Sequence, residues 1–395
     1  MVVERLAPYA VNIFAKMSAL AAEVGAVNLG QGFPDEDGPP AMLEAARQAI
    51  TDGVNQYPPG LGIAELREAV AAQRLRRYAQ RFDPASEVLV TVGASEAIAA
   101  AVIGLVEPGS EVIVVEPYFD TYAPNIAMAG AHRVSVPLVP DGRGFALDVD
   151  AVRTAITPRT RAMIVNSPHN PTGMVLSDAE CQALAEVAVD ADLLVISDEV
   201  YERLTFDGRE HLPLASYPGM AQRTVTISSA AKMFNCTGWK IGWACGPAEL
   251  VNGVRAAKQY LSYVGGAPFQ PAVAYALDHE DAWVDGLRDA LQTKRDRLAA
   301  ALTGIGFKVH DSAGTYFLCA DPRPLGFADG ASFCEELPHR VGVAAIPMSA
   351  FCEPGAASER WRHLVRFAFC KRDETLDEAI GRLSALAPAG PASPS

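Results

Sequence analysis

The sequence predicts an α/β protein whose large domain has a mostly parallel central sheet flanked by helices, joined to a smaller α+β domain. Between Glu87 and Pro247, short β-rich segments alternate with helical segments, as in a parallel sheet buried on both faces. A long helical segment from Asp281 then leads to a separate group of strands. About half of the 395 residues are apolar, which suffices for one large core and one smaller core.

Each element follows from a local pattern. Runs rich in β-branched residues predict strands, and Ser177 has the side chain and position of a helix N-cap. In chain order we expect strands at 87–92, 111–115, 161–166, 192–197, 223–228, 240–245, 315–320 and 364–370, and helices at 95–106, 177–189, 281–302 and from 373. The expected division is an N-terminal arm with part of the small domain (1–45), a large domain (46–290), a C-terminal small domain (291–388) and a disordered Pro-rich tail (389–395).

Composition excludes several classes of function. The 33 basic and 47 acidic residues give a net charge of −14, which disfavours nucleic acid and anionic membranes as partners. No apolar run is long enough to span a membrane, and no signal peptide is visible. The seven cysteines are scattered and no zinc spacing occurs, so we expect a cytoplasmic protein with an organic cofactor and no metal site.

Lys232 is the leading candidate for a catalytic residue. It lies among Ala230, Ala231, Met233 and Phe234, and such surroundings lower the pKa of an amine enough for it to condense with an aldehyde. Taken alone, a lysine is usually a surface residue. Its neighbours in the predicted fold favour the chemistry of pyridoxal 5′-phosphate.

Asp198 and Tyr201 are the first of these neighbours. Asp198 follows an apolar strand, where a buried carboxylate needs a cationic partner such as a protonated pyridine nitrogen. Tyr201 then reaches the phenolic oxygen of the same ring. A helix cap with a core tyrosine is the alternative. Asn170 lies in a turn made rigid by Pro168 and Pro171, which aims its amide at the same cleft.

A phosphate site is predicted where a strand enters a helix. The N–H groups of Ala94 and Ser95 lie at that helix N-terminus, and Ser229 and Lys240 complete the cup. The same segment nearly matches the nucleophile elbow of hydrolases, which makes Ser95 a rival nucleophile. Neither a dinucleotide-binding Gly-x-Gly-x-x-Gly after a strand nor a nucleotide-binding P-loop occurs.

Together these motifs make the chain resemble a class I aminotransferase of the fold type I pyridoxal phosphate enzymes. The resemblance covers about nine-tenths of the sequence, from 27–34 through 116–119 to 365–370. Within this class the chain is similar to the kynurenine and glutamine transaminase group, and most of all to the actinobacterial N-succinyldiaminopimelate aminotransferases.

The resemblance implies a role for each matching residue. Lys232 would be the Schiff-base lysine, Asp198, Tyr201 and Asn170 would hold the ring, and Phe119 would stack on it. Arg366 would clamp the α-carboxylate of the substrate, as its planar fork suits, with Asn170 and the backbone of Gly32 on the same side. Tyr57 would reach the phosphate from a neighbouring subunit, which implies a homodimer.

The expected activity is amino transfer between an amino acid and a 2-oxo acid, commonly 2-oxoglutarate, in lysine biosynthesis. A kynurenine-, methionine- or glutamine-type aminotransferase with cysteine-conjugate β-lyase activity is the alternative. A cofactor-sensing regulatory module is a remote one, because the match leaves no room for a DNA-binding domain. Gly265 and Gly266 suggest space for a long substrate, and Lys16 and Lys258 are candidate cations for its distal carboxylate.

Overall fold

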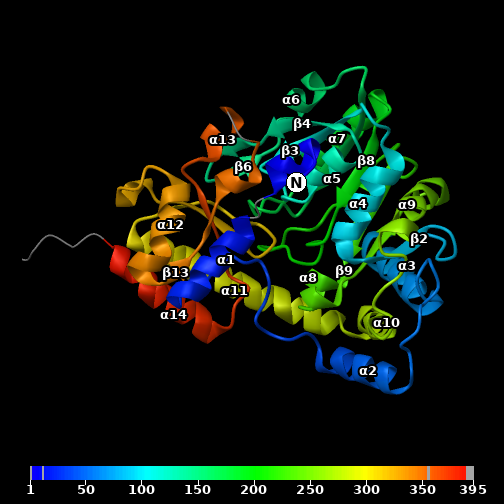
Figure 1. The fold of residues 1–395 in the computed structure, drawn as a ribbon, viewed down its shortest axis with the longest axis horizontal. Coiled ribbons are helices and arrows are strands. Elements are labelled where there is room, and N and C mark those ends of the chain that lie inside the picture. The colour runs from blue at the N-terminus through cyan, green and yellow to red at the C-terminus, as the bar shows by residue number, and fades with distance from the viewer. Residues whose placement is uncertain (1, 11–12, 354–355, 388–395) are drawn as a thin grey trace, which may run out of the picture.

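The structure is a computed structural model, and it describes residues 2–10, 13–353 and 356–387. The tail predicted at the C-terminus, 389–395, and residue 388 before it lie outside the described residues. Figure 1 shows two groups of elements side by side, one around the central sheet and one built from both ends of the chain.

The central sheet has seven strands and confirms the predicted class. All neighbouring strands run parallel except β10, which is antiparallel to both of its neighbours. The sequence predicts the position of β10 but not its direction. The order across the sheet is β2 (Val88–Val92), β10 (Ile241–Cys245), β9 (Thr224–Ser229), β8 (Leu194–Asp198), β7 (Thr160–Asn166), β3 (Glu111–Glu116) and β4 (His132–Pro137).

Helices cover both faces of this sheet because alternate strand residues point to opposite sides. Val112 and Val114 pack with one set of helices, and Ile113 packs with the other. The first set is α4 (Gly93–Leu105), α5 (Tyr122–Met128) and α9 (Ala248–Leu261), and the second includes α7 (Asp178–Asp190). Ser177 caps α7 in a capping box with Glu180, as the sequence predicts.

A third core lies at the β2 and β10 edge. Val88, Val90 and Trp243 pack there against three helices. These helices are α2 (Pro40–Thr51), α3 (Ala64–Tyr78) and α10 (Phe269–His279).

The second group of elements joins the two ends of the chain. A four-stranded sheet has the order β11 (Lys308–Val309), β12 (Phe317–Asp321), β15 (Val365–Ala368), β14 (Ile346–Pro347). Beside it, β1 (Val27–Asn28) pairs in parallel with β13 (Val343–Ala344). The surrounding helices are α1 (Ile13–Val24), α11 (Asp281–Ile305), α12 (Gly330–Val341), α13 (Ala356–Trp361) and α14 (Asp373–Leu383).

No helix in the described ranges is both long and apolar enough to cross a bilayer. Short elements complete the structure. The remaining elements are α6 (Val149–Thr154), α8 (Ala230–Met233), the hairpin β5 (Val139–Asp141) and β6 (Gly144–Ala146), and the 3₁₀ helices η1 (Glu4–Tyr9), η2 (Leu214–Ser216), η3 (Thr237–Trp239), η4 (Arg323–Leu325), η5 (Met348–Phe351) and η6 (Ser384–Leu386).

Candidate active site

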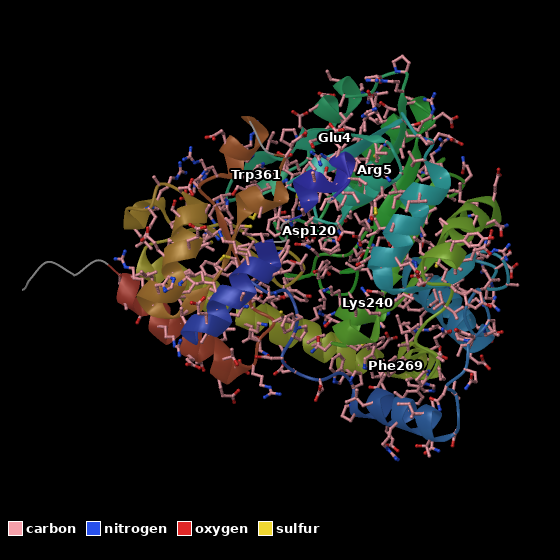
Figure 2. The ribbon with its side chains drawn as sticks, viewed as in Figure 1. Glu4, Arg5, Asp120, Lys240, Phe269 and Trp361 are labelled. Atoms are coloured by element: carbon pink, nitrogen blue, oxygen red, sulfur yellow. The ribbon has the colours of Figure 1, made fainter. Side chains whose placement is uncertain are left out.

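A cavity lies where the carboxyl ends of β7 and β8 meet the start of α4, the usual ligand position in a parallel sheet. Figure 2 shows Asp120 and Lys240, two of its lining residues, near the middle of the molecule. Ten of the predicted site residues line the cavity: Gly32, Ala94, Ser95, Phe119, Asn170, Asp198, Tyr201, Lys232, Lys240 and Arg366. Ser229 and Tyr57 do not line it.

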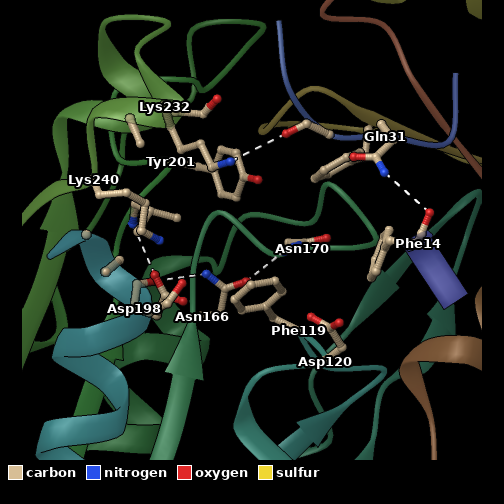
Figure 3. Close-up of a pocket in the computed structure, with 18 of the residues that line it drawn as sticks. Phe14, Gln31, Phe119, Asp120, Asn166, Asn170, Asp198, Tyr201, Lys232 and Lys240 are labelled. Carbon is tan, nitrogen blue, oxygen red and sulfur yellow. Dashed lines mark hydrogen bonds between the residues drawn. The ribbon is translucent and has the colours of Figure 1, made fainter. Parts of the chain in front are cut away.

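Lys232 reaches the cavity from α8, which starts directly after β9. Its Nζ donates to the carbonyl of Gly32 at 3.4 Å, a contact drawn in Figure 3. The aromatic rings of Tyr201 and Tyr316 lie 5.9 and 5.6 Å from the amine. Burial, reinforced by the nearby positive charge of Arg366, lowers the pKa of Lys232 to about 8. The amine is therefore poised for chemistry near neutral pH.

Asp198 is buried at the last position of β8. Its Oδ2 accepts from the hydroxyl of Tyr122 at 2.6 Å, and its Oδ1 accepts from the amide of Val200 at 3.3 Å. Burial raises its pKa to about 6, although the Tyr122 hydrogen bond acts in the opposite direction. A cation beside this carboxylate would favour its charged form.

Asn166 fixes the geometry between Asp198 and Asn170. Its Nδ2 donates to the backbone carbonyl of Asp198 at 2.9 Å, and its Oδ1 accepts from the amide of Asn170 at 2.7 Å (Figure 3). Sequence reasoning identified Asn166 only as a strand end. The structure makes it the link that places two of the predicted residues.

Arg366 is a buried guanidinium on β15 with no carboxylate in ion-pair contact among the described residues. It donates to Asn170 Oδ1 at 2.8 Å and to the Gly30 carbonyl at 2.9 Å, and its Nε has no partner. Its Cζ lies 3.8 Å from the ring centre of Phe317 and 4.6 Å from that of Phe351. Burial lowers its pKa to about 10. Such a group favours a carboxylate ligand.

The start of α4 forms a pocket for an anion. Gly93 has a φ of +70°, and a side chain there would place its Cβ 3.2 Å from Nζ of Lys240. The Lys240 amine thus lies directly beside the helix N-terminus, and the described residues place no carboxylate in ion-pair contact with it. Ser229 is instead buried at the end of β9. No histidine lines the described cavity, so Ser95 lacks the histidine base of a Ser-His-Asp triad.

Several predicted residues lie elsewhere. Tyr57 is 82% exposed, with its ring 5.6 Å from that of Tyr263. Gly265 packs against Val92 and does not line the cavity. Neither candidate cation lines it: Lys16 pairs with Glu335 on the surface, and Lys258 donates to the Gly60 carbonyl.

Sequence reasoning missed other residues that line the cavity, among them Phe14, Gln31, Asp120, Thr237 and Phe317. Asp120 is the most informative, because burial raises the pKa of this carboxyl group while Arg366 opposes the rise. Its position directly after Phe119, within an aromatic run, was the available signal. Phe14 lies in the N-terminal segment, which no local pattern connects to the site, whereas Gln31 directly precedes Gly32, which the resemblance already placed there.

These groups fit the three functional ends of pyridoxal 5′-phosphate. Lys232 would provide an amine for the aldehyde, Asp198 a carboxylate for the pyridine nitrogen, and Lys240 with the start of α4 a positive site for the phosphate. Arg366 remains free for the carboxylate of a substrate. Phe119 lines the same cavity (Figure 3), and its ring meets that of Tyr122, the residue that donates to Asp198, edge to face at 5.8 Å.

Comparisons with known proteins agree with this chemistry. The chain is 73% identical over 392 residues to the probable N-succinyldiaminopimelate aminotransferase of Mycobacterium tuberculosis, covering 98% of this chain and 99% of that protein. The solved structure of N-succinyldiaminopimelate aminotransferase from that organism superimposes with a TM-score of 0.96, at 73% identity, over 98% of this chain and 100% of that one. Kynurenine–oxoglutarate transaminase 3 of Rattus norvegicus is 38% identical over 393 residues, covering 93% of this chain and 86% of that protein.

The model of the family "Aminotransferase class I and II" matches residues 24–383, a span that contains every residue lining the cavity except Phe14. The chain therefore belongs to the class I and II aminotransferases, which depend on pyridoxal 5′-phosphate.

Proposed function

We propose that this aminotransferase moves an amino group between N-succinyl-LL-2,6-diaminopimelate and 2-oxoglutarate, a step of lysine biosynthesis. The observation that carries the proposal is the 73% identity, over nearly the full length of both chains, to the Mycobacterium tuberculosis protein named for this substrate. The proposal places the enzyme in the cytoplasm, and its seven reduced, buried cysteines suit a reducing compartment.

The cavity supports a distinct task for each residue. When bound, pyridoxal 5′-phosphate supplies an aldehyde carbon that carries the amino group and a ring that withdraws electrons from the substrate Cα. Lys232 would hold that aldehyde, and its free amine would move a proton to and from Cα. Arg366, with Asn170 and Gly32, holds the α-carboxylate and so fixes the orientation of the Cα–H bond.

The other residues hold the cofactor. Asp198 and Tyr201 would hold the ring, and Phe119 would stack on it. Ala94, Ser95, Ser229 and Lys240 would hold the phosphate, and three of them, all but Ser229, line the cavity. The proposed assembly is a homodimer in which Tyr57 of each chain contacts the phosphate of the other. The exposure of Tyr57, at 82%, supports this assignment.

The first test is Lys232→Ala. The variant should lose amino transfer with every amino acid, because the other amine lining the described cavity, that of Lys240, lies at the start of α4, where the proposal places the phosphate. Single-turnover spectra with excess amino acid would measure the loss, and thermal unfolding would confirm that the variant is folded. Substantial transfer by this variant would remove the proposed role of Lys232.

Substrate identity needs a separate comparison. We expect kcat/KM to be highest for N-succinyldiaminopimelate with 2-oxoglutarate, and lower for kynurenine and methionine. The 38% identity to the rat transaminase favours kynurenine as the second candidate. A higher kcat/KM for kynurenine, with pyruvate and ammonia released from a cysteine conjugate, would establish that candidate instead.

A further inference from the structure

Tyr316 does not line the cavity, but it contacts residues that do. Its hydroxyl donates to the carbonyl of Gly32 at 2.6 Å, and the same carbonyl accepts from Nζ of Lys232 at 3.4 Å. The rings of Tyr316 and Tyr201 also meet edge to face at 5.3 Å. One carbonyl oxygen is thus shared by a phenol and by the central amine of the site.

The backbone holds this arrangement closely. A side chain at Gly32 would place its Cβ 2.6 Å from Cζ of Phe317, so only glycine lets the segment approach this far. Thr315, directly before Tyr316, has a φ of +67°, and its backbone amide donates to the Leu204 carbonyl. The turn directs Tyr316 to the Gly32 carbonyl and Phe317 to the guanidinium of Arg366.

We propose that Tyr316 is a positioning residue that keeps Lys232 in its uncharged form: by donating to the Gly32 carbonyl, it limits how strongly that carbonyl can bind an ammonium group. The proposal rests on the function assigned above to Lys232. A carbonyl that already accepts a short hydrogen bond from a phenol is a weaker acceptor for a second donor. The charged amine needs that acceptor more than the neutral amine does, so the competition favours the neutral form.

Other charged or titratable groups also face Lys232, and a valid test must leave them in place. They are Asp198, Tyr201, Lys240, Arg366 and Cys370. Replacing Tyr316 by phenylalanine keeps all of them and also keeps the ring that lies 5.6 Å from the amine. The substitution removes only the hydroxyl group.

The experiment measures the titration of Lys232 directly. The full-length chain, freed of cofactor, is treated with formaldehyde and a reducing agent at pH 6 to 10, and methylation of Lys232 is followed by mass spectrometry. In Tyr316→Phe the midpoint should move up by about one pH unit, so that labelling at pH 7 falls about tenfold, the effect of one stronger hydrogen bond to a charged group. In the loaded enzyme, kcat should fall at neutral pH and recover as the pH rises, while KM changes little.

Tyr217→Phe is the matched control. The hydroxyl of Tyr217 donates to Asp178 at 2.7 Å, and neither residue lines the cavity, so loss of this hydroxyl should change neither measurement. A second variant keeps the hydroxyl: 3-fluorotyrosine at position 316 is a stronger donor and should move the midpoint down. An unchanged midpoint in Tyr316→Phe, or an upward shift with fluorotyrosine, would overturn the proposal. Neither result would affect the role proposed for Lys232, which the Lys232→Ala variant tests separately.

Discussion

Arg366 holds a buried positive charge whose known partners are an amide oxygen, a backbone carbonyl and aromatic rings. None of these neutralises the charge, so an incoming carboxylate gains a partner that has already lost its water. The planar guanidinium also fixes the angle at which that carboxylate binds. Orientation and charge therefore come from the same side chain.

Arg366→Lys should lower kcat/KM by about 10- to 100-fold for amino acids, because lysine keeps the charge but cannot bind the carboxylate with two parallel hydrogen bonds. Steady-state kinetics with an amino acid and with the corresponding amine, which lacks the carboxylate, would measure this loss. The kcat/KM for the amine should fall little. Arg323→Lys is the control, since Arg323 pairs with Asp321 and is half exposed. Equal losses for the acid and the amine would contradict the assigned role.

Charged residues within apolar segments could be predicted from the sequence to lie at the site. Lys232, Asp198 and Arg366 are charged residues in apolar surroundings, and the cost of burying them suggests a function. Tyr316 could not be predicted in this way, because an aromatic residue beside a strand is normally core. Gln31 was missed because its contact with the site depends on packing between distant segments.

The turn after β8 is held from behind by a buried ionic network. Arg74 of α3 donates to Glu199 and to Glu202, each at 2.8 Å, and all three side chains are almost fully buried. Glu202 also accepts from Ser228 on β9 at 2.6 Å. Because Glu199 follows Asp198 in the chain, the network anchors one side of the cofactor site to α3.

Arg74→Met should destabilise the protein by about 3 to 5 kcal/mol, because two buried carboxylates lose their counter-charge. Although burial opposes it, the charge of Arg74 lowers the pKa of Glu199 to about 2 from 4.5. The stability that the charged Glu199 carboxylate contributes is therefore present above pH 4.5 and is lost as the pH falls through 2. In the variant this carboxylate gains a proton more easily, so the stability difference from the wild type should shrink between pH 7 and pH 5.

Urea unfolding at both pH values would measure these differences. Arg76→Met, on the same helix, is the matched control, because Arg76 pairs with Asp281 at 3.3 Å while 41% exposed and should contribute less than about 1 kcal/mol. Equal destabilisation by the two substitutions, or a difference that widens at pH 5, would show that the network does not act as an ionic anchor.

Regular elements were predicted well where a local pattern determines them. The helix at 178–190 and the strands at 160–166 and 224–229 have strong periodicity or β-branched runs. Pairings such as β1 with β13 could not be predicted, because two-residue strands separated by more than 300 positions carry no local signal. The antiparallel direction of β10 is likewise set by tertiary packing and not by composition.

At the scale of the whole molecule, apolar groups gather on one exposed part of the surface. Tyr57 and Tyr260 are 82% and 86% exposed, and Leu261 and Tyr263 are each about half exposed. Tyr57 contacts Tyr263, and Tyr260 and Leu261 end α9, so these residues belong to neighbouring segments. Exposed aromatic groups of this kind are typical of an interface.

In the proposed homodimer this surface would be a subunit contact that also completes the cofactor site. The wild type should therefore sediment at about twice its chain mass of 41.9 kDa. The double variant Tyr260→Asp, Tyr263→Asp should sediment as a monomer and bind pyridoxal 5′-phosphate more weakly, because buried charges oppose association and Tyr57 no longer reaches the neighbouring site. Val189→Asp, on α7 at 39% exposure, is the control and should remain dimeric. A wild type that sediments as a monomer, or a double variant that stays dimeric with unchanged cofactor affinity, would show that this surface serves no shared site.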